Sequence, residues 1–78
     1  MFDLEILTPD KELFSGKAEA LTATAVDGEI GILSHHAPLI TALKKGTLRI
    51  TLPNGEKKEI PLGQGLLKTE NNRVVVLG

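Results

Sequence analysis

The chain has 78 residues, a net charge of −1 at pH 7, no cysteine and only two aromatic residues. This length corresponds to one small domain with a marginal core, and the lack of cysteine excludes disulfides and Cys-based zinc or redox sites. The near-zero charge and scarce aromatic side chains argue against nucleic-acid binding, which relies on a basic face and on base stacking. We therefore expect a partner protein to supply part of the stability.

No segment has the pattern of a membrane span or a secretion signal. No apolar run approaches the roughly 20 residues of a spanning helix, and acids follow Met1 where a signal peptide carries bases. The sequence therefore predicts an intracellular, soluble chain.

The dominant period of the chain is two, which is typical of strands, and the first half begins with a clear alternation of apolar and acidic residues. Within residues 2–6 three apolar residues alternate with two acids, and this pattern predicts the first strand. The elements that follow are a turn at residues 8–11, a turn at 15–17, a strand of small and β-branched residues over 18–26 with both faces covered, and a short strand over 30–33. Gly31 inside the last of these predicts a bulge or a close backbone approach.

The second half of the chain predicts two β-hairpins. Asn54-Gly55 lies between two alternating runs, and Asn-Gly is a strong hairpin signal because both residues tolerate positive φ. Asn71-Asn72 separates two further apolar runs, the second of which is too rich in valine to favour a helix. The predicted strands of these hairpins cover residues 47–52, 58–62, 66–70 and 73–77.

The segment from Ser34 to Lys45 is ambiguous. Its leucine and isoleucine spacing, with Pro38 early and Gly46 just after, fits a helix of one or two turns. A strand over residues 39–43 is favoured, because turns punctuate the whole sequence at the spacing of all-β domains. The sequence thus predicts a single all-β domain over residues 1–78, a compact β-sandwich or flattened barrel of short, mostly antiparallel strands.

The residues that carry reactive groups do not form a recognisable catalytic or metal motif. A nucleophilic site at Ser34 would need a histidine held by an acid, and no strand–serine–helix elbow is present. His35 and His36 point to opposite faces if extended, although on a loop they and Asp27 or Glu29 could converge on a metal. No glycine pair precedes a helix pattern, so no phosphate cradle is expected. We therefore predict a non-catalytic interaction protein without metal or cofactor, which presents residues 28–33 as an exposed loop on a rigid sheet.

Four separated blocks resemble the epsilon subunit of F-type ATP synthase, the homologue of the mitochondrial delta subunit. The most specific is Gly28-Glu29-Ile30-Gly31-Ile32-Leu33 followed by His36-Ala37-Pro38-Leu39. The others are residues 4–9 with 13–16, residues 43–46 leading to 48–50, and residues 63–65 with 74–77. The resemblance covers essentially the whole chain in order and spacing.

The chain also departs from the family's pattern. Ser34 and His35 stand where the family usually has Pro-Gly, Lys45 where it has proline, and Gln64 where it has glycine. These are turn positions, so local loop shape is affected. Family members usually continue into a C-terminal hairpin of two helices, whereas this chain stops at Gly78.

The resemblance implies a β-sandwich at the foot of the rotating central stalk. Such a module does no chemistry and needs no cofactor; it links the gamma subunit to the polar loops of the membrane c-ring, for assembly with the catalytic core and for rotational coupling. It implies peripheral association with the bacterial inner membrane on its cytoplasmic side, or with the thylakoid membrane on its stromal side. Because inhibition of ATP hydrolysis resides mainly in the helical hairpin, little inhibitory capacity is expected.

The resemblance also assigns residues to the two partners. Thr8 and Thr41 are expected to face gamma, and Glu29 is expected to make a polar contact with a basic loop of the c-ring. The full set expected to face the c-ring is Gly28, Glu29, Ile30, Gly31, His36, Ala37 and Pro38. The alternative is a free-standing β-sandwich binding domain with an unrelated partner.

Overall fold

The computed structural model describes residues 1–78 and consists of nine strands and no helix. The strands are β1 Phe2–Leu7, β2 Glu12–Ala18, β3 Ala20–Ala25, β4 Gly28–Leu33, β5 Leu39–Leu43, β6 Gly46–Thr51, β7 Lys57–Leu62, β8 Gly65–Glu70 and β9 Arg73–Leu77. Burial alternates along most of them, as the period of two predicts. The predicted all-β class is confirmed.

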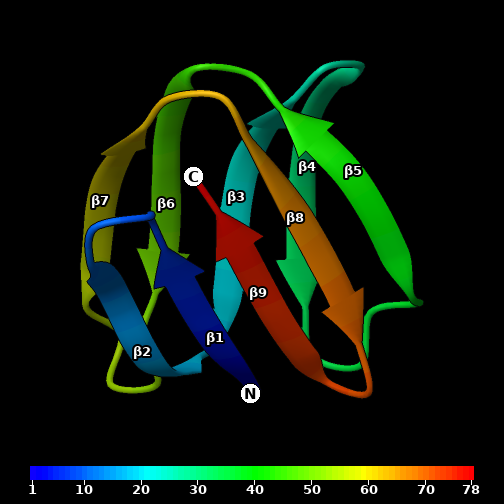
Figure 1. Ribbon diagram of the computed structural model, residues 1–78. Coiled ribbons are helices and arrows are strands. Elements are labelled where there is room, and N and C mark those ends of the chain that lie inside the picture. The colour runs from blue at the N-terminus through cyan, green and yellow to red at the C-terminus, as the bar shows by residue number, and fades with distance from the viewer.

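The strands form two layers that nearly close into a barrel (Figure 1). The front layer is β2-β1-β9-β8-β5, and the back layer is β4-β3-β6-β7. Every ladder is antiparallel except β1–β9, which is parallel. The layers are joined by one bridge, Ala25 with Leu43. On the opposite side, between β2 and β7, the Lys58 ammonium lies 5.9 Å from the centre of the Phe14 ring.

The core fills the space between the layers. Alternate residues point inward, so Leu4 and Ile6 of β1 are buried together with Leu67 of β8 and Val76 of β9. The 15 members of the core are Phe2, Leu4, Ile6, Ala18, Leu21, Ala23, Ala25, Ile32, Leu43, Leu48, Ile50, Leu62, Leu67, Val74 and Val76. Burying one large side chain of this kind contributes about 1.5–3 kcal/mol, which makes these positions the main source of stability.

Both predicted hairpins and the strand over residues 39–43 are confirmed. Asn71 and Asn72 have φ values of 53° and 59°, the left-handed conformation of a two-residue type I′ turn. In the other hairpin only Gly55 has positive φ, at 91°, because the connection is longer than two residues. The helix considered for this region does not form, since Leu39–Leu43 pairs along its length with β8.

Two of the predicted breaks are wrong. Residues 15–17 do not turn; β2 continues through them as the partner of β1, with Gly16 opposite Leu4. Gly31 makes neither a bulge nor a close approach, because β3 and β4 pair in unbroken register and a side-chain carbon at this position would meet no atom within 4 Å. The predicted run 18–26 is interrupted at Glu19, and its outer face is half-buried rather than covered.

The strand directions sort the connections onto two ends of the sandwich (Figure 1). The upper end carries the C-terminus and the turns after β1, β3, β5 and β7. The lower end carries the N-terminus and the connections after β2, β4, β6 and β8. A strand such as β4, with six residues, separates the two ends by roughly 17 Å.

Candidate functional site

The first part of the family signature, residues 28–33, lies on a strand and not on a loop. Gly28–Leu33 is strand β4, and the turn of this hairpin is Val26-Asp27. The expectation of an exposed loop over residues 28–33 is therefore wrong; backbone pairing with β3 extends the strand through Glu29 and Gly28. Since β4 pairs with β3 alone, it is an edge strand.

Glu29 lies on the outer face of this edge strand, near the upper end. Its side chain is 64% exposed, and its carboxylate lies 3.9 Å from the guanidinium of Arg49. His36, Ala37 and Pro38 lie in the connection after β4, at the lower end. The structure thus divides the set that was expected to face the c-ring into two groups at opposite ends of β4.

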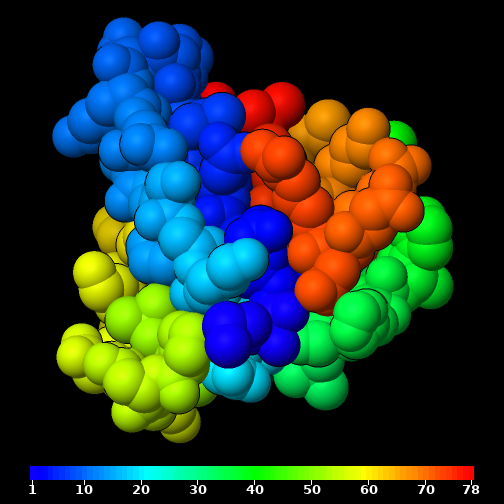
Figure 2. Space-filling view, turned by 90° about the horizontal axis from the view of Figure 1, so that it is seen from below, coloured from blue at the N-terminus to red at the C-terminus, as the bar shows by residue number.

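The lower end is tied together by Asn72, whose role the sequence did not reveal. Its side-chain oxygen accepts the His35 backbone N–H at 2.8 Å, and its side-chain nitrogen donates to the Met1 carbonyl at 2.9 Å. Figure 2, which views this end from below, shows the N-terminal segment (blue) between the orange-red and cyan segments. His35 has φ of 59°, so Asn72 holds its loop in an unusual conformation.

The histidines do not lie with the acids that a metal site or a catalytic relay would need. His36 donates from Nδ1 to the Ala37 carbonyl at 2.7 Å, within its own loop. Asp27 lies in the turn before β4, whereas Ser34 follows that strand, so the strand length separates them. The arrangement that a hydrolase relay or a mixed histidine–carboxylate metal site requires is therefore not formed.

Thr8 and Thr41, the residues expected to face gamma, lie on the two sides of the front layer. Thr8 opens the upper-end turn after β1 and donates from its hydroxyl to the Lys11 carbonyl at 3.1 Å. Thr41 lies in the middle of β5, opposite Leu67 of β8. Both side chains are partly exposed.

Four apolar side chains cross the outer face of the front layer from β1 to β5, whereas Thr41 has its side chain on the inner face, opposite the buried Leu67. Register places Leu7 of β1 beside Leu77 of β9, Leu77 beside Leu66 of β8, and Leu66 beside Ala42 of β5. We call Leu7, Leu77, Leu66 and Ala42 the apolar row. Leu77 is 46% exposed and Leu66 is 40% exposed. On its lower side Val75 and Ile40 also face outward, with Lys68 of β8 between them.

Below the apolar row, the same face is charged. The ammonium of Lys17 lies 2.6 Å from the carboxylate of Asp3, and the guanidinium of Arg73 donates a hydrogen bond to the carboxylate of Glu5. The hydrogen bond from Lys17 lowers the pKa of Asp3, and the bond to Glu5 raises the pKa of Arg73. The front face therefore changes from apolar to paired charge over the length of its strands.

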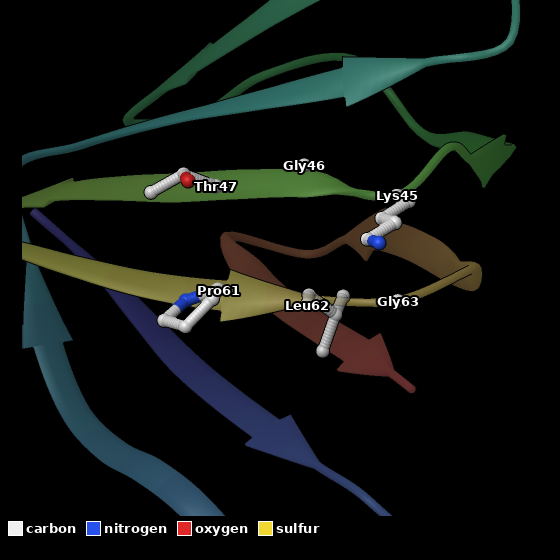
Figure 3. Close-up of a pocket in the computed structure, with 6 residues that line it drawn as sticks. All are labelled: Lys45, Gly46, Thr47, Pro61, Leu62 and Gly63. Carbon is white, nitrogen blue, oxygen red and sulfur yellow. The ribbon is translucent and has the colours of Figure 1, made fainter.

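An open groove of about 340 Å³ lies at the upper end of the β6–β7 ladder (Figure 3). Lys45, Gly46 and Thr47 line one side, and Pro61, Leu62 and Gly63 line the other. Figure 3 shows Lys45 at the end next to Gly63, and Thr47 beside Pro61 at the other end. Its only charged group is the Lys45 ammonium, so the groove offers little of the converging polar chemistry of a small-molecule site.

Comparison with known proteins identifies similar chains. Residues 1–78 match the family described as "ATP synthase, Delta/Epsilon chain, beta-sandwich domain". The chain is 45% identical over 74 residues to the ATP synthase epsilon chain of Desulforamulus reducens, covering 95% of this chain and 55% of that one. It is 40% identical over 76 residues to that of Caldicellulosiruptor saccharolyticus, with 97% and 55% covered. The chain thus spans about half the length of these curated relatives.

Solved structures share the fold. A chain of the Euglena gracilis mitochondrial ATP synthase, in a structure of OSCP, F1 and the c-ring, matches with a TM-score of 0.89 at 21% identity, over 95% of this chain and 48% of that one. A chain of the Tetrahymena thermophila mitochondrial ATP synthase, in a structure of its central stalk and c-ring, has a TM-score of 0.80 at 16% identity, over 96% and 60%. No helix here has the length and hydropathy needed to cross a membrane.

Proposed function

The chain belongs to the family of ATP synthase delta and epsilon chains, whose β-sandwich domain it matches over residues 1–78, and we propose that it is a non-catalytic module of the central stalk of an F-type ATP synthase. In this role it links the gamma subunit to the c-ring, contributes to assembly with the catalytic core and transmits rotation. It reaches the membrane only through the complex. The similarity to epsilon chains of bacterial ATP synthases supports the proposal.

The apolar row is the observation that carries the proposal. A row of three leucines and one alanine, at least partly exposed across four hydrogen-bonded strands, is unfavourable in water and is typical of a surface that a partner covers. Its two ends are Leu7 and Ala42, which directly adjoin Thr8 and Thr41. Thr8 therefore lies at one end of this surface, whereas Thr41 lies at the other end with its side chain on the inner face of β5. We assign the apolar row to gamma.

We assign the contact with the c-ring to the upper end of β4. Glu29 is exposed on the outer face there, and its carboxylate has only a loose protein partner. A basic loop of the c-ring is a suitable partner for this group, with Gly28, Ile30 and Gly31 beside it. The lower-end loop with His36, Ala37 and Pro38 is left out of this contact, because it lies at the other end of the strand.

The direct test is binding of the chain to the gamma subunit of its source enzyme, measured for the wild type and for Leu66→Glu. A carboxylate at the centre of an apolar interface leaves a buried charge unpaired, so we expect affinity to fall by at least tenfold, or about 1.4 kcal/mol. The matched control is Leu33→Glu, since Leu33 is 65% exposed on the other layer. This control is expected to bind as the wild type does.

Three outcomes would contradict the proposal or a part of it. If the wild type does not bind gamma but is retained by an unrelated protein, the free-standing binding domain is correct. If Leu33→Glu is as damaging as Leu66→Glu, the apolar row is not the gamma-facing surface. Addition of the chain to an epsilon-depleted enzyme checks the remaining expectation, since strong reversible inhibition of ATP hydrolysis would contradict a purely coupling role.

A further inference from the structure

Three charged side chains lie in a line across the outer face of the back layer. Arg49 of β6 stands directly opposite Glu59 of β7, and on its other side it reaches across β3 toward Glu29 of β4. Thr22 and Thr24 are the β3 residues beneath this line, since Thr22 pairs with Arg49 and Thr24 pairs with Glu29. Because these threonines are short, the longer side chains of β4 and β6, the strands on either side of β3, meet over them.

The two contacts of Arg49 are unequal. Its Nε donates a hydrogen bond to Glu59 at 3.3 Å, whereas its Nη1 lies 3.9 Å from the Glu29 carboxylate without a hydrogen bond. A charge-assisted hydrogen bond is stronger than a contact at the limit of an ion pair. The pair of Arg49 with Glu59 is therefore the stronger of the two, and the contact of Arg49 with Glu29 is the weaker.

This inequality determines what a docking partner must displace. When a lysine or arginine of a partner forms an ion pair with Glu29, Arg49 stays paired with Glu59, so no cation is left without a counter-charge. If Glu59 were absent, Arg49 would pair with Glu29 alone, and the partner would have to break that pair first. Exposed ion pairs of this kind are worth little individually, so the effect is a tuning of affinity rather than a switch.

We propose that Glu59, acting through Arg49, sets how freely Glu29 pairs with a cation of the docked partner. The partner is the basic loop that the proposed function places on the c-ring, and the inference rests on that function. Arg49 and Glu59 are positioning residues, since neither needs to touch the partner.

The test compares dissociation constants for two targets, the gamma subunit alone and gamma assembled with the c-ring. For the assembled target we expect Glu59→Gln to weaken binding about two- to fivefold, and Arg49→Gln to strengthen it by a similar factor. Neither variant is expected to alter binding to gamma alone, which also shows that each one folds. The matched control is Glu19→Gln, an exposed carboxylate at the lower end that removes the same charge.

The decisive comparison is the double variant Arg49→Gln with Glu59→Gln. With Arg49 gone, removal of Glu59 is expected to have no more effect than Glu19→Gln. If Glu29→Gln weakens binding but Glu59→Gln behaves as Glu19→Gln does, the positioning role is wrong while the c-ring contact stands. If Glu29→Gln has no effect on the assembled target, the c-ring contact itself is wrong, and the positioning role of Glu59 is wrong with it.

Discussion

The outer faces of the two layers have opposite character, although the same alternation of residues builds both. The front face presents the apolar row, with Leu66 and Leu77 40% and 46% exposed. The back face presents threonine, alanine and glycine around the line of Glu29, Arg49 and Glu59, with a single exposed leucine, Leu33, at the lower end of β4. Inner faces must be apolar for the core to form, so they say little about function. The outer faces are free to differ, and the proposed assignment to gamma and the c-ring accounts for their difference by two partners of different chemistry.

If the two faces serve different partners, the apolar row must contribute little to the fold itself. Leu67 and Leu66 are neighbours on β8, one fully buried and one facing outward. We expect Leu67→Ala to lower the free energy of unfolding by about 2–5 kcal/mol, since it leaves a cavity in the core. Leu66→Ala should cost less than about 1 kcal/mol. Urea unfolding of both variants measures this, and equal losses would mean that the row is part of the core.

A second prediction separates the two faces by salt. Apolar burial is insensitive to moderate ionic strength, whereas attraction between exposed charges is screened as the Debye length falls from about 30 Å at 0.01 M to about 10 Å at 0.1 M. Binding to gamma alone should therefore change little between these concentrations. The additional affinity that the c-ring supplies should fall several-fold. A strong salt dependence for gamma alone would place the charged face, not the apolar row, on gamma.

The smallest expected effect concerns the charged lower part of the front face. Lys17 lowers the pKa of Asp3, so the ionised carboxylate favours the folded state. This stabilisation is complete above the unfolded pKa, near 3.8, and is lost as the pH falls through the lower folded pKa. Replacement of Lys17 by Gln should raise the pKa of Asp3 in an NMR titration. An unchanged Asp3 pKa would show that the pair does not persist in solution.

Much of this architecture is predictable from local pattern, and the wrong predictions have physical causes. Alternation located the hairpins because each strand has one dry face. It failed at Gly16, where a turn-forming residue continues β2 because β1 supplies a pairing partner. It failed also for residues 28 and 29, which precede the predicted strand over 30–33, because whether a glycine-containing stretch is loop or strand depends on its neighbour β3.

The candidate sites are harder to predict from the sequence than the strands are. Breaks in the alternation, such as the adjacent leucines 66 and 67, do signal the apolar row, but only topology brings it together from four strands. The line of Glu29, Arg49 and Glu59 needs β3 to lie between β4 and β6. Asn72 bonds Met1, a residue 71 positions away, which no local pattern encodes.

The assignment of two faces to two partners can be measured by thiol labelling, because the natural chain has no cysteine. Single cysteines at positions 77, 29 and 33 then report the burial of each site through their rate of labelling by a thiol reagent. We expect that gamma alone protects Leu77→Cys, that Glu29→Cys is protected only when the c-ring is also present, and that Leu33→Cys is labelled at the free rate throughout. Protection of Glu29→Cys by gamma alone, or free labelling of Leu77→Cys in the full assembly, would contradict the assignment.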